Sequence, residues 1–198
     1  MKKYISMMAL ALSLTWGLTA CDVETDEEPG GTNIQNMCGY WDVSVSQIDE
    51  NGEVVYQPEE LFGLVDIPLY TFNTASNSTT KMWIDDQGEF WDYKFLVDIN
   101  YAAGTFSATD VPYNDEMREY AAAKAAGNPL VDEDGNELVA ETATITDAKI
   151  MLGAGKNLHG MPCDSIAFII TFSDDPYGAN YGYAKHLVTG VRHSGFTE

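Results

Sequence analysis

Residues 90–101, FWDYKFLVDINY, alternate apolar and polar side chains, and this pattern constrains the fold more than any other stretch. One face of an extended chain would carry Trp91, Tyr93, Phe95, Val97, Ile99 and Tyr101, while the other would carry Asp92, Lys94, Asp98 and Asn100, with Leu96 as the interruption. A period of two residues with one apolar face is the pattern of a half-buried β-strand.

The same alternation recurs along the chain between short turns. It predicts strands over residues 40–47, 64–72, 80–86, 90–101, 103–111, 141–152, 164–174 and 183–195. Pro68 cannot donate a backbone hydrogen bond, so its strand is expected at an edge or with a bulge. Gln87-Gly88 and Asp134-Gly135 have the composition of hairpin turns, the second within residues 130–139.

Residues 114–128 break the strand pattern and predict a helix. Asn114 or Asp115 can cap its start, acidic residues fill the first turn, alanines fill the body and Gly127 ends it. The sequence therefore predicts an all-β fold, an antiparallel up-and-down barrel of about eight strands with one inserted short helix. Such a barrel has room inside for side chains or one small ligand. The helix is a candidate plug or lid over one mouth.

The N-terminal residues have the pattern of an export signal. Lys2 and Lys3 precede the uncharged apolar run 4–18, which is shorter than the roughly 20 residues that a membrane span needs. Residues 18–21, LTAC, resemble the bacterial lipobox, so residues 1–20 are predicted to be a lipoprotein signal peptide and Cys21 the lipidated residue. The alternative is an ordinary secretion signal with a chance cysteine. The expected location is the cell envelope, anchored to the outer membrane at its surface or its periplasmic face.

Residues 21–33 are rich in acids and glycine and poor in aliphatic side chains. They cannot bury enough apolar surface to fold, so they are predicted to be a flexible acidic tether, or alternatively a sorting signal. Residues 34–198 are then predicted to form a single domain. The chain carries 31 acidic and 10 basic residues, a formal net charge of −21. This surface repels phosphates, so no nucleic-acid partner is expected.

The motifs also resemble a known family. The segments YWDVSV, GTFSATDV, DSIAFIITFSDDP and VTGVRHSGF, together with FNTA (72–75), WIDD (83–86) and Phe90-Trp91, are similar to the lipocalin-like bacterial lipoproteins called lipid-binding putative hydrolases. The resemblance covers residues 39–196 and implies a lipocalin-like barrel with a bound lipid or similar apolar ligand. It supplies no catalytic residue that can be assigned here. Residues 113–140 are longer than the resemblance leads us to expect, which suggests an inserted helix and hairpin.

Aromatic side chains on the predicted inner faces are the candidate ligand contacts. These are Trp83, Trp91, Tyr93, Phe95, Tyr101, Phe168 and Phe172. Ligand pockets are mainly apolar and aromatic with few polar groups, although such a stripe is also typical of an ordinary core. Lipid or another apolar small molecule is therefore the expected partner, together with the membrane through Cys21; no protein partner can be named.

Catalytic residues cannot be assigned from the sequence. The chain lacks a G-x-S-x-G motif. His159, His186 and His193 are candidate bases, and Ser165 and Ser194 candidate nucleophiles, but scattered histidines usually lie on the surface or hydrogen-bond within a core. An esterase-like hydrolase using the same cavity is the alternative function. A surface protein with a solid core that binds a glycan or a protein is a third possibility. Asp85 and Asp86 beside Trp83 suit a glycan, although shaping the turn explains them more simply.

No metal or cofactor is expected from the sequence. Residues 132–137, DEDGNE, begin like a calcium loop, but its sixth and twelfth positions hold Glu137 and Ala143 instead of glycine and glutamate. Cys38 and Cys163 are candidates for a disulfide in an oxidising compartment, or else two free thiols.

Overall fold

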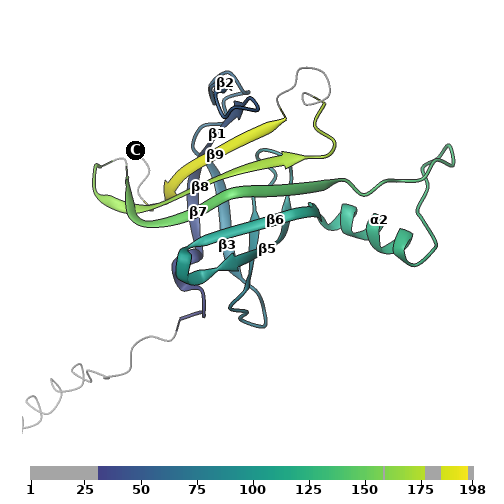
Figure 1. Ribbon diagram of the computed structural model, residues 1–198, viewed down its shortest axis with the longest axis horizontal. Coiled ribbons are helices and arrows are strands. Elements are labelled where there is room, and N and C mark those ends of the chain that lie inside the picture. Colours follow the sequence, from purple (N-terminus) through teal and green to yellow (C-terminus); the bar gives the residue numbers. More distant parts are fainter. Residues whose placement is uncertain (1–30, 158, 177–183, 196–198) are drawn as a thin grey trace, which may run out of the picture. The chain divides into compact units, whose positions relative to one another are not determined.

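Antiparallel strands form the framework of the computed structural model, which describes residues 31–157, 159–176 and 184–195 (Figure 1). The strands are β1 (Gly39–Ile48), β2 (Val54–Tyr56), β3 (Ile67–Asn73), β4 (Lys81–Asp85), β5 (Lys94–Asn100), β6 (Thr105–Pro112), β7 (Thr142–Lys156), β8 (Pro162–Phe172) and β9 (Lys185–Arg192). The helical segments are η1 (Gln35–Met37), η2 (Tyr101–Ala103) and α2 (Asp115–Ala125). The described residues from Thr32 onward belong to one structural unit.

The strands close into a barrel. Strand β1 pairs with β3, the later strands pair in sequence order up to β9, and β9 returns to pair with β1 from Trp41↔Arg192 to Ile48↔Lys185. The short strand β2 pairs only with the end of β1 and stays outside the ring. The predicted antiparallel up-and-down barrel of about eight strands with one inserted helix is therefore confirmed.

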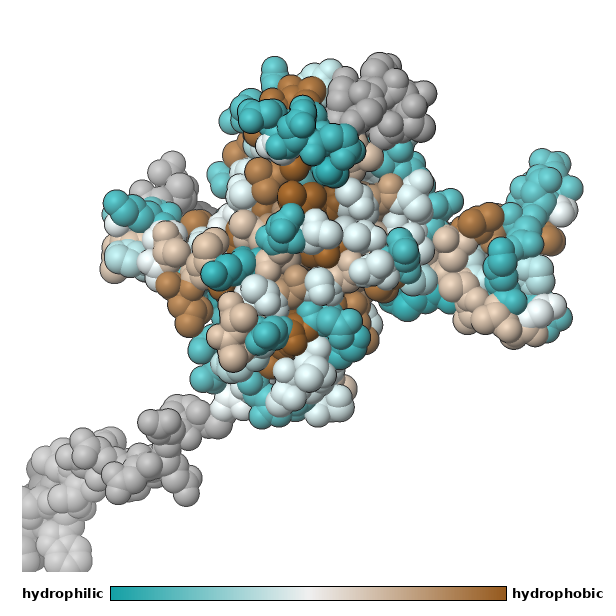
Figure 2. Space-filling view, in the orientation of Figure 1, coloured by the Kyte–Doolittle hydropathy of each residue, from teal (hydrophilic) through white to brown (hydrophobic). Residues whose placement is uncertain are grey.

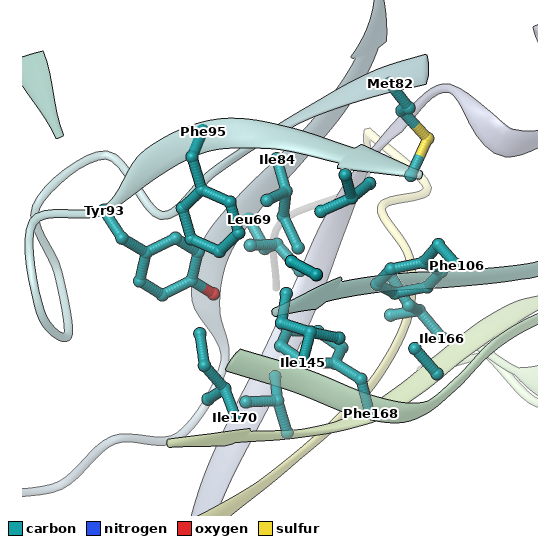
Figure 3. Close-up of a cluster of buried hydrophobic side chains, with 14 of the residues drawn as sticks. Leu69, Met82, Ile84, Tyr93, Phe95, Phe106, Ile145, Ile166, Phe168 and Ile170 are labelled. Atoms are coloured by element: carbon teal, nitrogen blue, oxygen red, sulfur yellow. The ribbon is translucent and has the colours of Figure 1, made fainter. Parts of the chain in front are cut away.

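The barrel interior is filled by apolar side chains. Every strand of the ring contributes alternate residues to it, as the period-two pattern predicts. Figure 3 shows side chains from facing strands pointing toward one another: Leu69, Met82, Ile84, Tyr93, Phe95, Phe106, Ile145, Ile166, Phe168 and Ile170. Phe95 and Phe168 are fully buried. Eight strands leave an interior that side chains can fill, so this barrel has a packed core.

One end of the barrel, where β1 begins and β9 ends, is closed by the segment that leads into β1; we call it the closed end. Ile34 and Met37 of that segment are buried. The Arg192 guanidinium lies over the Trp41 ring, 4.5 Å from its centroid, and donates hydrogen bonds to the Cys38 carbonyl and to Asp164. These contacts tie η1 and strand β8 to β9.

Helix α2 begins where its capping signals place it. The Asn114 side chain accepts a hydrogen bond from the Met117 amide, and Gly127 beyond the C-terminus has a φ of +78°. The helix contains no buried residue, and Figure 1 shows it extending away from the barrel. The idea that it plugs a mouth is wrong. The turn at Gly135 is confirmed, with Val131 and Glu137 forming a bridge.

Three expectations are corrected or lie outside the described residues. Strand β5 starts at Lys94 instead of residue 90, because residues 90–93 belong to a loop. Cys38 and Cys163 are free thiols, so the candidate disulfide is not formed. The signal peptide (1–20), Cys21 and most of the tether lie outside the described residues. Within the described part of the chain, no helix has the length and apolar character needed to span a membrane.

Candidate ligand-binding site

The loop between β4 and β5 is organised by one carboxylate. Asp86 is 2% exposed, and its two oxygens accept hydrogen bonds from the backbone amides of Gly88, Phe90, Trp91, Asp92 and Tyr93 at 2.8–3.2 Å. Burial raises the pKa of Asp86, while these donors act in the opposite direction. The loop is thereby fixed in a shape that places Phe90 and Trp91 over the end of the barrel opposite the closed end, which we call the mouth.

Aromatic rings gather around Phe172, the last residue of β8. The Trp91 ring stacks on it with centroids 4.5 Å apart and planes at 5°. Phe90 and Tyr113 meet the same ring edge to face at 5.9 and 5.7 Å. The Tyr113 hydroxyl donates to Asp174, and burial together with this bond raises the pKa of Tyr113. The rings form one wall of the mouth.

A second wall comes from the loop between β2 and β3. The amides of Leu61 and Leu64 bond to the carbonyls of Gln57 and Pro58, and the Leu64 carbonyl accepts from Val45 of β1. This pairing holds the loop against the barrel. Phe62 lies at its tip, 92% exposed, with a φ of +55° that non-glycine residues seldom adopt.

Between these walls is a pocket of about 290 Å³. It is lined by Gln47, Leu61, Phe62, Leu64, Glu89, Phe90, Trp91 and His186. Five of the eight lining side chains are apolar. Figure 2 shows hydrophobic surface close to the end of the barrel that carries β2, set among hydrophilic side chains. Pockets of this composition, about 300 Å³ and larger, bind small molecules.

His186 is the ionisable ring of the pocket. Its Nε2 lies 2.8 Å from Oδ2 of Asp175, and the side chains are 3% and 0% exposed. Burial lowers the pKa of His186, and the bond to Asp175 opposes that shift. Phe90 packs edge to face on the imidazole at 5.0 Å. The His186 Nδ1 is buried and has no hydrogen-bond partner among the described residues.

The residues predicted from sequence to contact ligand lie in four places: the mouth, the packed core, the outer face of β4 and the closed end. Trp91 lines the mouth pocket, and Phe172 and Tyr93 pack directly below it. Phe95 and Phe168 lie in the packed core.

Trp83 and Tyr101 are elsewhere. The inward direction expected for Trp83 is wrong, because Met82 and Ile84 take the inner face of β4. Trp83 stacks on Phe72, with Arg118 of α2 above its ring. The strand ends at Asn100, so Tyr101 falls in η2 at the closed end.

Sequence reasoning missed much of the pocket. Leu61 and Phe62 lie in a segment without periodicity, and their apolar character in a polar loop was the available signal. Leu64 was read as the first residue of strand 64–72, but β3 begins at Ile67. Phe90 was read as part of a strand. His186 was identified as a histidine of strand 183–195, but its partner Asp175 is brought to it only by the turn after β8.

The paired acids beside Trp83 shape the turn. Asp85 accepts from the Gln87 amide and pairs with Lys94 at 2.9 Å, while the Asp86 carboxylate is surrounded by backbone donors. Among the described residues, no three or more histidine, cysteine or acidic side chains are close enough together to hold a metal ion.

The fold and pocket together define a closed eight-stranded antiparallel barrel with an apolar pocket at one mouth. Residues 26–197 match the family described as "Lipid-binding putative hydrolase", and the chain belongs to that family. The lipid-binding character of the family fits a barrel that binds an apolar ligand. A search of curated proteins finds no match to the chain.

Proposed function

We propose that this chain is a lipid-anchored binding protein of the cell envelope, held at the outer membrane through Cys21, which takes up a lipid or other small apolar ligand at the barrel mouth. The observation that carries the proposal is the apolar pocket formed by Leu61, Leu64, Phe90 and Trp91, with one buried imidazole in its wall. The core beneath it is packed, so the ligand is assigned to the mouth instead of the barrel centre.

The pocket size limits what enters it. At about 30 Å³ for each water-sized group, 290 Å³ holds on the order of ten such groups. A medium-length chain or one end of a longer lipid fits. Each buried methylene contributes about 0.8 kcal/mol, so several are enough for measurable affinity. The exposed Phe62 ring at the rim offers apolar surface to the part of the ligand that stays outside.

A hollow of about 310 Å³ at the closed end is the weaker candidate. Residues 101–104, which include Tyr101, form much of its wall, with Met37, Ile150 and Leu152 beside them. It contains no buried imidazole and no aromatic wall like that around Phe172. The mouth pocket has both, so it is preferred.

Native mass spectrometry of the chain lacking residues 1–21, purified without detergent and followed by organic extraction, tests the binding proposal. We expect a lipid or fatty compound near one per chain, or its uptake from a lipid mixture. A bare mass that stays bare after incubation with mixed lipids would contradict the proposal and favour a surface-interaction role.

Tryptophan quenching locates the ligand. A nitroxide-labelled fatty alcohol bound at the mouth would quench Trp91, which lines the pocket, more strongly than Trp83 on the outer face. The variant Trp83→Phe should retain the quenching and Trp91→Phe should lose most of it. The reverse result would move the ligand out of the mouth.

Anchoring is tested separately. A clickable fatty-acid label should be incorporated into the full-length protein in cells, and Cys21→Ser should abolish incorporation and release the protein from the membrane fraction. Labelling that persists in this variant would contradict the anchor.

Esterase-like hydrolysis is the second candidate, favoured by the His186–Asp175 pair, since an imidazole oriented by a carboxylate is a common general base. In the described part of the chain, however, no serine, threonine or cysteine hydrogen-bonds to His186. Binding is therefore preferred. Turnover of nitrophenyl esters of short fatty acids that disappears in His186→Phe would favour hydrolysis instead.

A further inference from the structure

The hydrogen-bonding role of His186 is fixed by its buried partner. An ionised carboxylate only accepts hydrogen bonds, so the contact between Asp175 Oδ2 and Nε2, at 2.8 Å, places the proton of a neutral imidazole on Nε2. Nδ1 then carries a lone pair and acts as an acceptor. Burial lowers the pKa of His186, which keeps the ring in this neutral form near pH 7.

That acceptor is unsatisfied within the described residues. Nδ1 is buried without a hydrogen-bond partner there, in a side chain that is 3% exposed. A buried acceptor without a donor is costly, and most such atoms in native proteins are paired. Because His186 lines the mouth pocket among Leu64, Phe90 and Trp91, a ligand in that pocket can supply the donor.

We propose that the ligand of the mouth pocket is an apolar molecule carrying a neutral hydroxyl, which donates a hydrogen bond to Nδ1 of His186. The inference rests on the proposed binding function and specifies its ligand class: a fatty alcohol, a sterol or another hydroxylated lipid. His186 is thus a specificity-determining residue.

The charges around His186 disfavour an anionic head group. A carboxylate has no donor for the Nδ1 lone pair, and it would enter a pocket that Glu89 already lines, with Asp175 bound to the other nitrogen of the same imidazole. Burying it unpaired would be expensive. An ether has the same apolar bulk as an alcohol but also lacks the donor. Alcohol, ether and carboxylate therefore form a matched series in which only the head group changes.

The test measures the affinity of the chain lacking residues 1–21 for decanol, methyl nonyl ether and decanoate by calorimetry at neutral pH. We expect decanol to bind about tenfold more tightly than the ether, since satisfying a buried acceptor is worth roughly that factor, and decanoate to bind most weakly. Equal affinities for decanol and the ether, or tightest binding of decanoate, would overturn the hydroxyl inference while leaving the binding function intact. If none of the three binds, the proposed function fails as well.

Two further measurements separate the head-group contact from general packing. His186→Phe should keep the affinity for the ether and lose the preference for decanol. If His186→Phe bound neither decanol nor the ether, the substitution would have damaged the pocket itself. The head-group contact is therefore also measured in the wild-type protein, by nitrogen NMR of its imidazoles. Decanol should shift the Nδ1 resonance of an Nε2-protonated His186, and the ether should not. An Nδ1-protonated ring, or identical shifts with both ligands, would overturn the inference.

Discussion

At the scale of single residues, Arg192 shows how one side chain closes an end of the barrel. Its guanidinium covers Trp41 and donates to Asp164 and to the carbonyls of Cys38 and Asn36. Its loss would leave the part-buried Cys38 carbonyl without this donor and remove the contacts to Asp164 and the Trp41 ring, so Arg192→Ala should lower the free energy of unfolding by about 2–3 kcal/mol.

Arg118 supplies the control for that prediction. It also lies over a tryptophan, Trp83, but on the outer face and 5.7 Å from the ring centroid. Arg118→Ala should cost about 1 kcal/mol or less. Urea denaturation of both variants measures the difference. Equal losses would mean that the closed end does not depend on Arg192 in the way its contacts indicate.

His186 should make stability depend on pH. Burial lowers its pKa below the ordinary 6.5. As the pH falls below that value the unfolded chain takes up a proton that the folded protein resists, so the free energy of unfolding falls, by at most about 1.4 kcal/mol per pH unit, until the folded pKa is reached. Asp175 lies beside the ring and Glu89 across the pocket. Both are acidic, so they favour the protonated imidazole and oppose this loss of stability.

Urea denaturation between about pH 8 and about pH 5 measures the effect. The wild-type protein should lose more stability over this range than His186→Phe, which has nothing to protonate at position 186. His159 is exposed, so His159→Gln should behave like the wild type. A His186→Phe variant with an unchanged pH profile would contradict a buried neutral histidine.

At the scale of structural elements, the loop between β4 and β5 depends on Asp86. Replacing it by alanine leaves five backbone amides without their acceptor, and all five hydrogen bonds are partly or fully buried. Asp86→Ala should therefore destabilise the fold by about 2–4 kcal/mol and weaken ligand binding, because Phe90 and Trp91 lose their position.

Asp92→Asn is the matched control, since Asp92 is exposed in the same loop. It should leave both properties within about 0.5 kcal/mol of wild type. Near-ultraviolet circular dichroism reports the Trp91–Phe172 stack, and urea denaturation reports stability. A full aromatic signal in Asp86→Ala would show that the loop has another support.

The same loop shows what the sequence could and could not predict. Alternation identified the strands of the ring and the inner faces of Tyr93, Phe95 and Phe168, because burial on one face imposes a period of two. It misplaced Trp91, since the apolar pattern continues into the loop that Asp86 holds. It also gave Trp83 the wrong face, because the neighbouring Met82 and Ile84 take the interior. The mouth pocket is formed by segments that are far apart in the sequence, and a local sequence pattern cannot predict that they come together.

At the scale of the whole molecule, the pairing of β1 with β9 joins the first and last strands of the ring. This seam closes the ring around the core. It also supports both ends of the barrel, because β1 carries Gln47 at the mouth, while β9 carries His186 at the mouth and Arg192 at the closed end. Long-range closure of this kind is entropically costly and depends on close backbone contact.

Gly190 is a point of close backbone contact in this seam. It pairs with Val43, and a Cβ at this position would come within 2.2 Å of the Asp42 carbonyl oxygen and 2.8 Å of the Val43 Cα. These neighbours are backbone atoms of the facing strand, so they cannot move aside without separating the strands. Gly190→Val should therefore cost about 3 kcal/mol or more and open the seam. Thr189→Val, at the exposed neighbouring position, should be nearly neutral.

Hydrogen exchange measures where the barrel opens. In Gly190→Val the amides of β1 and β9 should lose protection before those of β4 and β5. A uniform loss across the barrel would mean that the seam is no weaker than the rest of the ring.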